Sequence, residues 1–476
     1  MSPASQTMLS RFAVVTSIFA LIMVGVVAAT RPEGGGSGSA STAPVAVALS
    51  EFAISPSTVT VPKGGSINVT NNGSVAHNVG VTDTALKTRD LNGGESDTLD
   101  LSELDPGTYE LYCAISGHKE AGMTATLIIT DGSAASAESA AQSEGSHATG
   151  HDDIATLDPS DAQAQRINKQ FEDDMNAGVQ TFLDYAAKYA NGEIATGNQP
   201  IEPEVEADGT KVFNLTAEIT DWEVSPGKTV KAWTYNNQVP GPWIRVEPGD
   251  KVKINLTNKL PISTDIHWHG IDVPFEQDGV APITQDFIRP LEEYSYEFTV
   301  QNHPGMGMYH AHMHGQTAIV NGLFAIFQVG DVPLPLGRTV GNVEIPADLD
   351  VTTLQEIPMV LNDAGVIGLS LNGKSFPATQ PIAAKKDEWF LIHFFNEGLQ
   401  GHPMHLHRQP QIVVAKDGFP LDAPYRMDTL WVSPGERYTA LVKAEDPGKW
   451  AFHCHIVSHA ESDEGLFGMV TVLIVE

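Results

Sequence analysis

A turn followed by a short strand occurs three times in this chain, and this repeat constrains the fold more than any other feature. An Asp-Pro-Gly turn leads into a strand that ends at Cys113, and a second copy with identical spacing ends at Cys454. A third copy begins at Pro304 and ends at Ala311, where the other two have cysteine. Repeats of this kind indicate one structural unit used several times. We therefore predict three copies of one domain.

Strand-like segments fill most of the sequence. Short alternating runs separated by Gly- and Pro-containing turns occupy residues 45–131, a pattern typical of a β-sandwich. We predict a linker at residues 132–199. Its first part is low in sequence complexity, and its second part has a helical pattern. Strand-like segments resume at about residue 200 and favour two further domains, at 200–335 and 336–476. We therefore predict an all-β protein of three Greek-key β-sandwich domains, which 476 residues can accommodate.

The N-terminus has a hydrophobic segment. Phe12–Ala29 are eighteen residues without a charge, directly after Arg11. The apolar core of a cleaved signal peptide is usually about 7–15 residues, whereas a membrane-spanning helix needs about 20. We expect residues 1–30 to be an exported signal or a membrane anchor, with the anchor favoured because no Ala-x-Ala cleavage site is evident. Residues 31–44 follow as a flexible linker, and the rest of the chain is expected to be extracytoplasmic.

Charge and cysteine content narrow the function. The chain has 27 basic and 59 acidic residues, a net charge of −32, so it lacks a basic surface for nucleic acid. Its two cysteines, Cys113 and Cys454, each lie inside a histidine-rich motif. Two separate metal-binding thiolates are therefore a better interpretation than one disulfide.

The first cysteine belongs to a candidate copper site. Cys113, His118 and Met123 follow one another at intervals of five residues, and His77 lies on an earlier strand. Two imidazoles, one thiolate and a weak thioether form a blue-copper electron-transfer site. The alternative to a copper site is a buried free cysteine beside an exposed histidine. Four ligand types at this spacing disfavour that alternative. Residues 45–131 resemble plastocyanin-like, or cupredoxin, domains.

Paired histidines indicate a second kind of metal centre. Because side chains alternate along a strand, the two histidines of a His-x-His pair face the same side. Four such pairs could supply eight imidazoles to three copper ions. The pairs are His267 with His269, His310 with His312, His405 with His407, and His453 with His455.

The last pair brackets Cys454, whose side chain must point to the opposite face of the strand. His402 and His459 could join Cys454 at a second blue-copper site. One strand would then link this site to the three-copper cluster.

These motifs resemble the four copper-binding motifs of laccase-type multicopper oxidases over residues 205–476, and in particular the two-domain laccases. The resemblance implies three cupredoxin-like domains in all and copper as the cofactor. It implies a type 1 copper at His402, Cys454 and His459, and a type 2 copper at His267 and His405. The type 3 pair would be held by the remaining six histidines: His269, His310, His312, His407, His453 and His455.

Two departures from the family pattern stand out. In the middle domain Thr264, Ala311 and Gln316 replace the type 1 ligands, so that domain is expected to hold no type 1 copper. After His459 the usual Gly-Met is replaced by Gly465-Leu466. We expect Leu466, rather than Met469, at the axial position, which raises the reduction potential because a weaker donor stabilises Cu(II) less.

The resemblance implies an oxidase. An unidentified donor, a small molecule, metal ion or redox protein, would deliver single electrons to the type 1 copper, and the cluster would reduce O₂ to water. Asp278 and Glu461 are the candidate proton-supplying acids. A turn aspartate is an equally good interpretation of Asp278, which precedes a glycine.

Two other functions stay open at this stage. A copper nitrite reductase would keep a cysteine in the middle domain and would not need His-Cys-His in the last, so the chain has the reverse pattern. A non-enzymatic copper or electron carrier explains the first domain but not the eight paired histidines. By analogy with two-domain laccases, we expect a homotrimer in which neighbouring chains complete each cluster, and an N-terminal domain that relays electrons.

Overall fold

The computed structural model describes residues 44–50, 53–56, 58–72, 76–82, 84–115, 118–119, 123–130, 160, 162–301, 303–462 and 465–476. Strands account for 48% of the structure and helices for 11%, so the predicted all-β class is confirmed. The hydrophobic segment expected at 1–30 lies outside the described residues. Of the helices in the described part, none combines the length and apolar character needed to cross a membrane.

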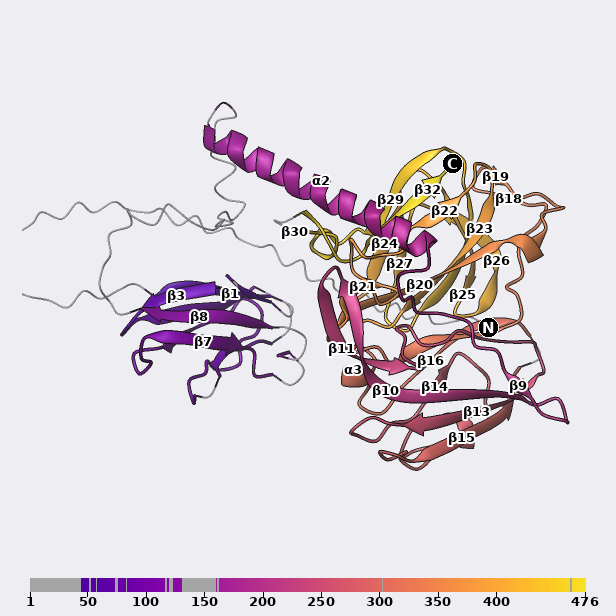
Figure 1. Cartoon of the computed structure of the whole chain (residues 1–476), viewed down its shortest axis with the longest axis horizontal. Coiled ribbons are helices and arrows are strands. Elements are labelled where there is room, and N and C mark those ends of the chain that lie inside the picture. The colour runs from indigo at the N-terminus through magenta and orange to yellow at the C-terminus, as the bar shows by residue number, and fades with distance from the viewer. Residues whose placement is uncertain are drawn as a thin grey trace, which may run out of the picture. The chain divides into compact units, whose positions relative to one another are not determined.

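The N-terminal domain has two four-stranded sheets, drawn in indigo and violet in Figure 1, with orders β2-β1-β4-β6 and β3-β8-β7-β5. Alternate residues of β3, β4 and β8 are buried, because successive side chains point to opposite faces. Both sheets contribute these residues to one apolar core. The strands are Val45–Ser50 (β1), Ala53–Ser55 (β2), Thr58–Pro62 (β3), Ser66–Asn71 (β4), Gly80–Val81 (β5), Ser96–Asp100 (β6), Gly107–Tyr112 (β7) and Thr124–Thr130 (β8).

The middle domain has sheets of order β11-β10-β13-β15, with β9 paired to β10, and β12-β17-β16-β14. Trp268, Tyr296 and Tyr309 lie at the centre of its core, where their rings contact one another. The strands are Glu204–Val205 (β9), Lys211–Ser225 (β10), Lys228–Tyr235 (β11), Ile244–Val246 (β12), Lys251–Asn258 (β13), His267–His269 (β14), Glu293–Thr299 (β15), Gly305–His310 (β16) and Phe324–Val329 (β17).

The C-terminal domain has sheets of order β21-β20-β23-β28-β25-β26 and β22-β32-β29-β24-β27. A second core, shared with the middle domain, joins the two domains. The strands are Gln355–Ala364 (β20), Gly368–Leu371 (β21), Ile382–Ala384 (β22), Trp389–Asn396 (β23), His402–Leu406 (β24), Gln411–Lys416 (β25), Phe419–Met427 (β26), Thr429–Val432 (β27), Arg437–Lys443 (β28), Gly448–Cys454 (β29) and Val470–Val475 (β32).

Short elements complete these two domains. They are the two-stranded ribbons Thr339–Val340 (β18) with Val343–Glu344 (β19), and Glu461–Ser462 (β30) with Gly465–Leu466 (β31), the short helix Gly315–Ala318 (α3), and the 3₁₀ turns Phe275–Gln277 (η1), Val351–Thr353 (η2) and Val457–His459 (η3).

The three domains repeat one strand topology. The cysteine strand β7 lies between β8 and β5, just as β16 lies between β17 and β14, and β29 between β32 and β24. In each domain the last strand also pairs in parallel with an earlier one: β8 with β3, β17 with β12, and β32 with β22. The repeated turns of the sequence therefore occupy equivalent strands.

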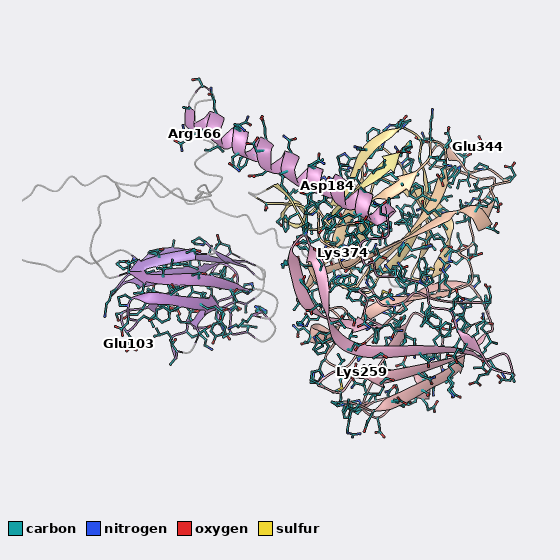
Figure 2. All side chains as sticks on the ribbon, viewed as in Figure 1. Glu103, Arg166, Asp184, Lys259, Glu344 and Lys374 are labelled. Atoms are coloured by element: carbon teal, nitrogen blue, oxygen red, sulfur yellow. The ribbon has the colours of Figure 1, made fainter. Side chains whose placement is uncertain are left out.

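A long helix, Ala162–Ala190 (α2), precedes the middle domain, within the region predicted to contain a helical segment. It exposes Arg166 and Asp184 to solvent, as Figure 2 shows. On another face Phe182 is buried and stacks on Phe376, with ring centroids 5.4 Å apart. The helix therefore packs against the C-terminal domain through its apolar side, near β31.

Candidate metal centres

The N-terminal domain brings together the ligands predicted for its copper site. His77, Cys113 and His118 are buried, and their potential ligand atoms lie within 4.8 Å of one another. The Cys113 Sγ atom is 3.4 Å from Nδ1 of His118 and accepts a hydrogen bond from the Asn78 amide at 3.5 Å. Burial raises the pKa of the Cys113 thiol. A site of this kind binds a metal by exchanging the thiol proton for the ion.

Met123 is fixed beside this site by the backbone. Its N–H donates to the His118 carbonyl at 2.9 Å, and its own carbonyl accepts from the Cys113 amide at 3.0 Å. The side chain is fully buried in the same core as Cys113. The thioether predicted from the sequence therefore belongs to the same cluster of residues.

A similar set of residues surrounds the second cysteine. Nδ1 of His402 and Nδ1 of His459 each lie 3.7 Å from the Sγ atom of Cys454, and all three side chains are buried. Burial raises the pKa of Cys454 to about 11 and lowers that of His459 to about 4. Two imidazole nitrogens converging on a buried sulfur form a donor set that suits copper.

The backbone around Cys454 identifies a different axial residue from the one predicted. The N–H of Met469 donates to the His459 carbonyl at 2.8 Å, and the Met469 carbonyl accepts from the Cys454 amide at 3.0 Å. These are the same two hydrogen bonds that Met123 makes in the first domain. Met469 is fully buried in the core that contains Cys454.

Leu466 does not occupy this place. It lies in the β30–β31 ribbon, where it pairs with Glu461 and packs against the small cluster around Phe182 of α2. These contacts favour Met469, rather than the predicted Leu466, at the axial position. The ribbon adds residues between His459 and Met469, so the methionine lies further along the chain from its histidine than in the first domain.

Four histidines of the middle domain form one quartet. Strands β14 and β16 pair in antiparallel register with His267 opposite His310, which turns the rings of both His-x-His pairs to the same side. Ring centroids within this quartet are 5.5 to 5.8 Å apart, and Nε2 of His310 is 3.4 Å from Nδ1 of His269. We call His267, His269, His310 and His312 the first quartet.

Four histidines of the C-terminal domain form an equivalent group. Strands β24 and β29 pair with His405 opposite His453. Ring centroids are 4.8 to 5.7 Å apart, and Nε2 of His407 is 3.1 Å from Nε2 of His453. We call His405, His407, His453 and His455 the second quartet.

Burial favours the uncharged form of four of these imidazoles, two in each quartet. Burial lowers the pKa of His310 to about 3, and burial with the nearby Arg437 charge lowers that of His269 to about 4. Burial also lowers the pKa of His407 and of His453. A neutral imidazole has a lone pair free for a metal ion, so these four histidines can bind a metal without any change of protonation at neutral pH.

Each quartet is open on one side. Within the described part of the chain, every ring contact of a quartet histidine is with a member of its own quartet. His312, His407 and His455 are exposed. The first quartet lines a cavity of about 500 Å³ together with residues 396–399 and 434–435.

The two predicted acids differ in position. Asp278 lies beside the first quartet: its carbonyl is 2.9 Å from Nδ1 of His267, and its carboxylate is 3.5 Å from the same atom. Glu461 is exposed on β30, and no contact with either quartet is found for it among the described residues.

Two buried carboxylates near the metal centres were not predicted. Asp363 Oδ2 lies 3.3 Å from Nε2 of His402, and Asp265 Oδ1 accepts the His312 amide at 2.7 Å. Burial raises the pKa of Asp265. Asp265 lies only two residues before His267, which is a signal the sequence did contain, whereas Asp363 is far from His402 along the chain and carries no such signal.

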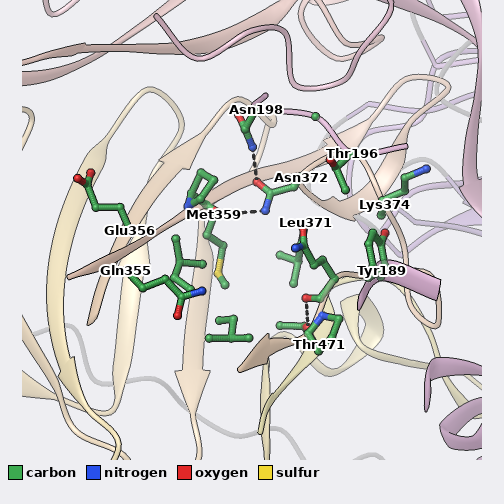
Figure 3. Close-up of a pocket in the computed structure, with 16 residues that line it drawn as sticks. Tyr189, Thr196, Asn198, Gln355, Glu356, Met359, Leu371, Asn372, Lys374 and Thr471 are labelled. Atoms are coloured by element: carbon green, nitrogen blue, oxygen red, sulfur yellow. Dashed lines mark hydrogen bonds between the residues drawn. The ribbon is translucent and has the colours of Figure 1, made fainter. Parts of the chain in front are cut away.

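In the middle domain, the three positions equivalent to the type 1 ligands hold neither cysteine nor histidine. Thr264 and Ala311 are buried at the equivalent positions, whereas Gln316 is exposed. A second cavity, of about 120 Å³, lies between α2 and the C-terminal domain and is shown in Figure 3. Tyr189, Asn198 and Thr471 line it, and it contains none of the predicted ligands.

Comparisons with known proteins agree with this arrangement. Residues 216–333 and 345–475 match two family models, both described as multicopper oxidase, and residues 16–129 match a cupredoxin-like domain. Laccase-9 of Arabidopsis thaliana is 27% identical over 225 residues, which cover 44% of this chain and 38% of that protein. Laccase-2 of Botryotinia fuckeliana is 29% identical over 282 residues, covering 50% and 45%. The chain spans less than half the length of these laccases.

Two solved structures are similar over most of their own length. The multicopper oxidase mgLAC is 32% identical with a TM-score of 0.50, and the match covers 56% of this chain and 86% of that chain. The blue copper oxidase from Nitrosomonas europaea is 29% identical, with the same TM-score of 0.50 and coverage of 56% and 86%. Together with the matched family models and the two histidine quartets, these similarities show that the chain belongs to the multicopper oxidase family.

Proposed function

We propose that this protein is a laccase-like oxidoreductase that oxidises a donor by single electrons at the Cys454 site and reduces O₂ to water at the quartets. One observation carries the proposal. At the end of β29, Cys454 contacts His402 and His459. The preceding residue, His453, belongs to the second quartet and contacts His407. One covalent strand thus connects an electron-accepting site with a multi-histidine site.

The chain's own residues prepare both sites for metal. When bound, copper supplies one-electron redox chemistry at Cys454 and O₂ chemistry at the quartets. Burial lowers the pKa of His310, so its lone pair is available at neutral pH, whereas Cys454 must release its proton on loading. The family resemblance supports the ligand roles: type 1 at His402, Cys454 and His459, type 2 at His267 and His405, and type 3 at His269, His310, His312, His407, His453 and His455.

Two further ligand assignments follow from the backbone geometry. We assign the axial position of the Cys454 site to Met469, because its hydrogen bonds repeat those of Met123. We assign a separate type 1 copper to His77, Cys113, His118 and Met123 in the N-terminal domain.

Copper content and O₂ consumption test the proposal. The full set of sites predicts about five copper ions per chain, against one or two for an electron carrier. Loaded protein should consume O₂ with a suitable donor, and His453→Ala should abolish that consumption while leaving the N-terminal site loaded. Anaerobic turnover of nitrite without O₂ consumption would contradict the proposal; the comparisons give nitrite reduction no support.

The quartets support assembly from several copies of the chain. Three copper ions need both quartets, and a second copy could bring its second quartet to the open first quartet of its neighbour. Closed rings are the usual outcome of such head-to-tail contacts, and the two-domain laccase resemblance favours a homotrimer. Mixing a His310→Ala/His312→Ala variant with a His453→Ala/His455→Ala variant should restore some activity, because one intact cluster can then form. Two inactive variants that stay inactive when co-assembled would argue against a shared cluster.

The N-terminal domain is proposed to relay electrons from a protein donor. Its buried Cys113 site is a complete ligand set of its own. Cys113→Ser should lower turnover with a protein donor more than turnover with a small donor that reaches Cys454 directly. Equal rates for wild type and variant with both donors would exclude the relay.

An extracytoplasmic location is proposed for the whole chain, with residues 1–30 as signal or anchor. The support is the uncharged Phe12–Ala29 segment. Fractionation of cells that produce the full chain distinguishes a membrane-bound form from a released one.

A further inference from the structure

One buried carboxyl group of the C-terminal domain lines the cavity of the first quartet. Glu397 follows the last residue of β23, and its amide donates to the Leu361 carbonyl at 2.9 Å, which holds the backbone in place. Only 6% of the residue is exposed, yet it lines the same cavity of about 500 Å³ as the four histidines of the first quartet.

One oxygen atom of the Glu397 carboxyl, Oε1, is buried without a hydrogen bond among the described residues. Burying a polar atom without a partner is costly, so such atoms usually bind water or have a functional role. The cavity is large enough to hold several waters, which need polar partners of this kind.

Charged and titratable groups around Glu397 come from several strands. Arg437 on β28 is 4% exposed, and its guanidinium donates to the carbonyls of Met306, Gly435 and Asp417 rather than to Glu397. Asp363 on β20 binds the amides of Leu399 and Gln400, two and three residues after Glu397.

Tyr235 on β11, in the middle domain, is close enough to Glu397 for the two groups to interact electrostatically. Glu397 is among the charges that raise the pKa of its hydroxyl, although burial is the main cause. Its Oη atom is also buried without a hydrogen-bond partner within the described residues. Of these two groups, Glu397 is the one that lines the cavity.

The protonation state of Glu397 differs from that of a surface glutamate. Burial raises the pKa of its carboxyl to about 8, and the Arg437 charge only partly opposes this. The side chain is therefore a neutral acid at pH 7, able to give up a proton. Positive charge bound in the cavity lowers this pKa, so the proton is released at or below pH 8.

We propose that Glu397 is a proton-donating residue of the first-quartet cavity, where it protonates oxygen while O₂ is reduced. The role rests on the proposed oxidase function. Reduction of O₂ to two waters takes four electrons, supplied by the donor, and four protons. Each proton that Glu397 gives to oxygen breaks its O–H bond, and the carboxylate regains a proton from solvent water at the cavity mouth. Asp278, whose side chain is 36% exposed, and Glu461, which is exposed, are not enclosed in this way.

The test compares Glu397→Gln and Glu397→Asp with the control Glu344→Gln, which changes an exposed carboxylate on β19 (Figure 2). All variants should carry the same copper content, and anaerobic reduction of the blue copper by the donor should be equally fast. O₂ consumption by Glu397→Gln should fall about 100-fold. The wild-type rate should decline at alkaline pH, where Glu397 has lost its proton, and this decline should be absent from the variant. Glu397→Asp should recover part of the rate.

A measurement on the metal-free protein gives an independent readout. Folded Glu397 keeps its proton between about pH 4.5 and 8 while the unfolded residue loses it, so wild-type Tm should fall as pH rises across this range. Glu397→Gln should remove that part of the slope, and Glu344→Gln should not.

The outcomes separate the two hypotheses. Loaded wild-type protein that consumes no O₂ defeats the proposed function and this role with it. An active wild type whose rate and pH profile are matched by Glu397→Gln rejects the role of Glu397 alone. Loss of copper from Glu397→Gln also rejects it, because the residue would then be needed for metal binding rather than proton transfer.

Discussion

The Oδ2 atom of Asp363 lies 3.3 Å from Nε2 of His402, and both side chains are completely buried. The carboxylate is itself held by the amides of Leu399 and Gln400, at 2.7 and 2.8 Å. Because Nε2 faces this carboxylate, Nδ1 of the same ring is turned toward Cys454. Asp363 is therefore a positioning residue for the Cys454 site, as outer carboxylates are for histidine ligands in other metal sites.

Replacing Asp363 should weaken this site. Asp363→Asn removes a negative charge that favours Cu(II), so the reduction potential should rise, and copper affinity should fall about 10- to 100-fold. Metal titration and redox titration of the blue absorption measure both effects. Asp422→Asn, at an exposed position, is the matched control. A variant with unaltered affinity and potential would contradict the positioning role.

Two substitutions, one of methionine by leucine and one of leucine by methionine, test the axial assignment. Met469→Leu should raise the reduction potential of the Cys454 site, because it removes a thioether donor. Leu466→Met should leave the potential unchanged, since residue 466 packs against the α2 cluster. Spectroelectrochemistry on both variants decides between the positions. A shift caused only by the exchange at 466 would restore the prediction made from the sequence.

Helix α2 should stabilise the C-terminal domain through one aromatic contact. Phe182 is 1% exposed and stacks on Phe376. Phe182→Ala should cost about 3–5 kcal/mol, the usual range for truncating a buried phenylalanine. Val179→Ala, on the same helix but 43% exposed, should change stability by less than about 0.5 kcal/mol. Urea unfolding of the two variants provides the comparison, and equal losses would show that α2 does not depend on this contact.

Glu356 should make the protein sensitive to acid. Burial alone would raise the pKa of its carboxyl, but the hydrogen bond from His393 at 3.0 Å and the Arg245 charge outweigh burial and lower it to about 2. A depressed carboxyl pKa stabilises the fold above the ordinary value of 4.5, and this stability is lost as pH falls toward 2. Glu356→Gln should therefore cost about 2–3 kcal/mol at pH 7.

The same variant should flatten the loss of stability between pH 4.5 and 2, the interval over which Glu356 takes up its proton. Unfolding free energies of wild type and Glu356→Gln, measured at several pH values, test this. Parallel curves for the two proteins would mean that other carboxyl groups cause the acid sensitivity.

The repeated turns, and the histidines that gather around each cysteine and in each quartet, could be predicted from the sequence alone. Alternation of side chains along a strand is a property of local backbone geometry, so His267 and His269 had to face one side, and Cys454 the side opposite to His453. The shared Asp-Pro-Gly turns likewise indicated equivalent strands in the first and last domains. These features depend only on neighbouring residues, which a sequence displays directly.

Only the tertiary structure decided the rest, because it depends on contacts between distant segments. The methionine lies five positions after His118 but ten after His459, and the β30–β31 ribbon absorbs the difference. Backbone hydrogen bonds across strands, rather than spacing, bring Met469 to the Cys454 site. Asp363 and Glu397 gain their importance from burial beside histidines of other strands, and burial is set by packing that no local pattern encodes.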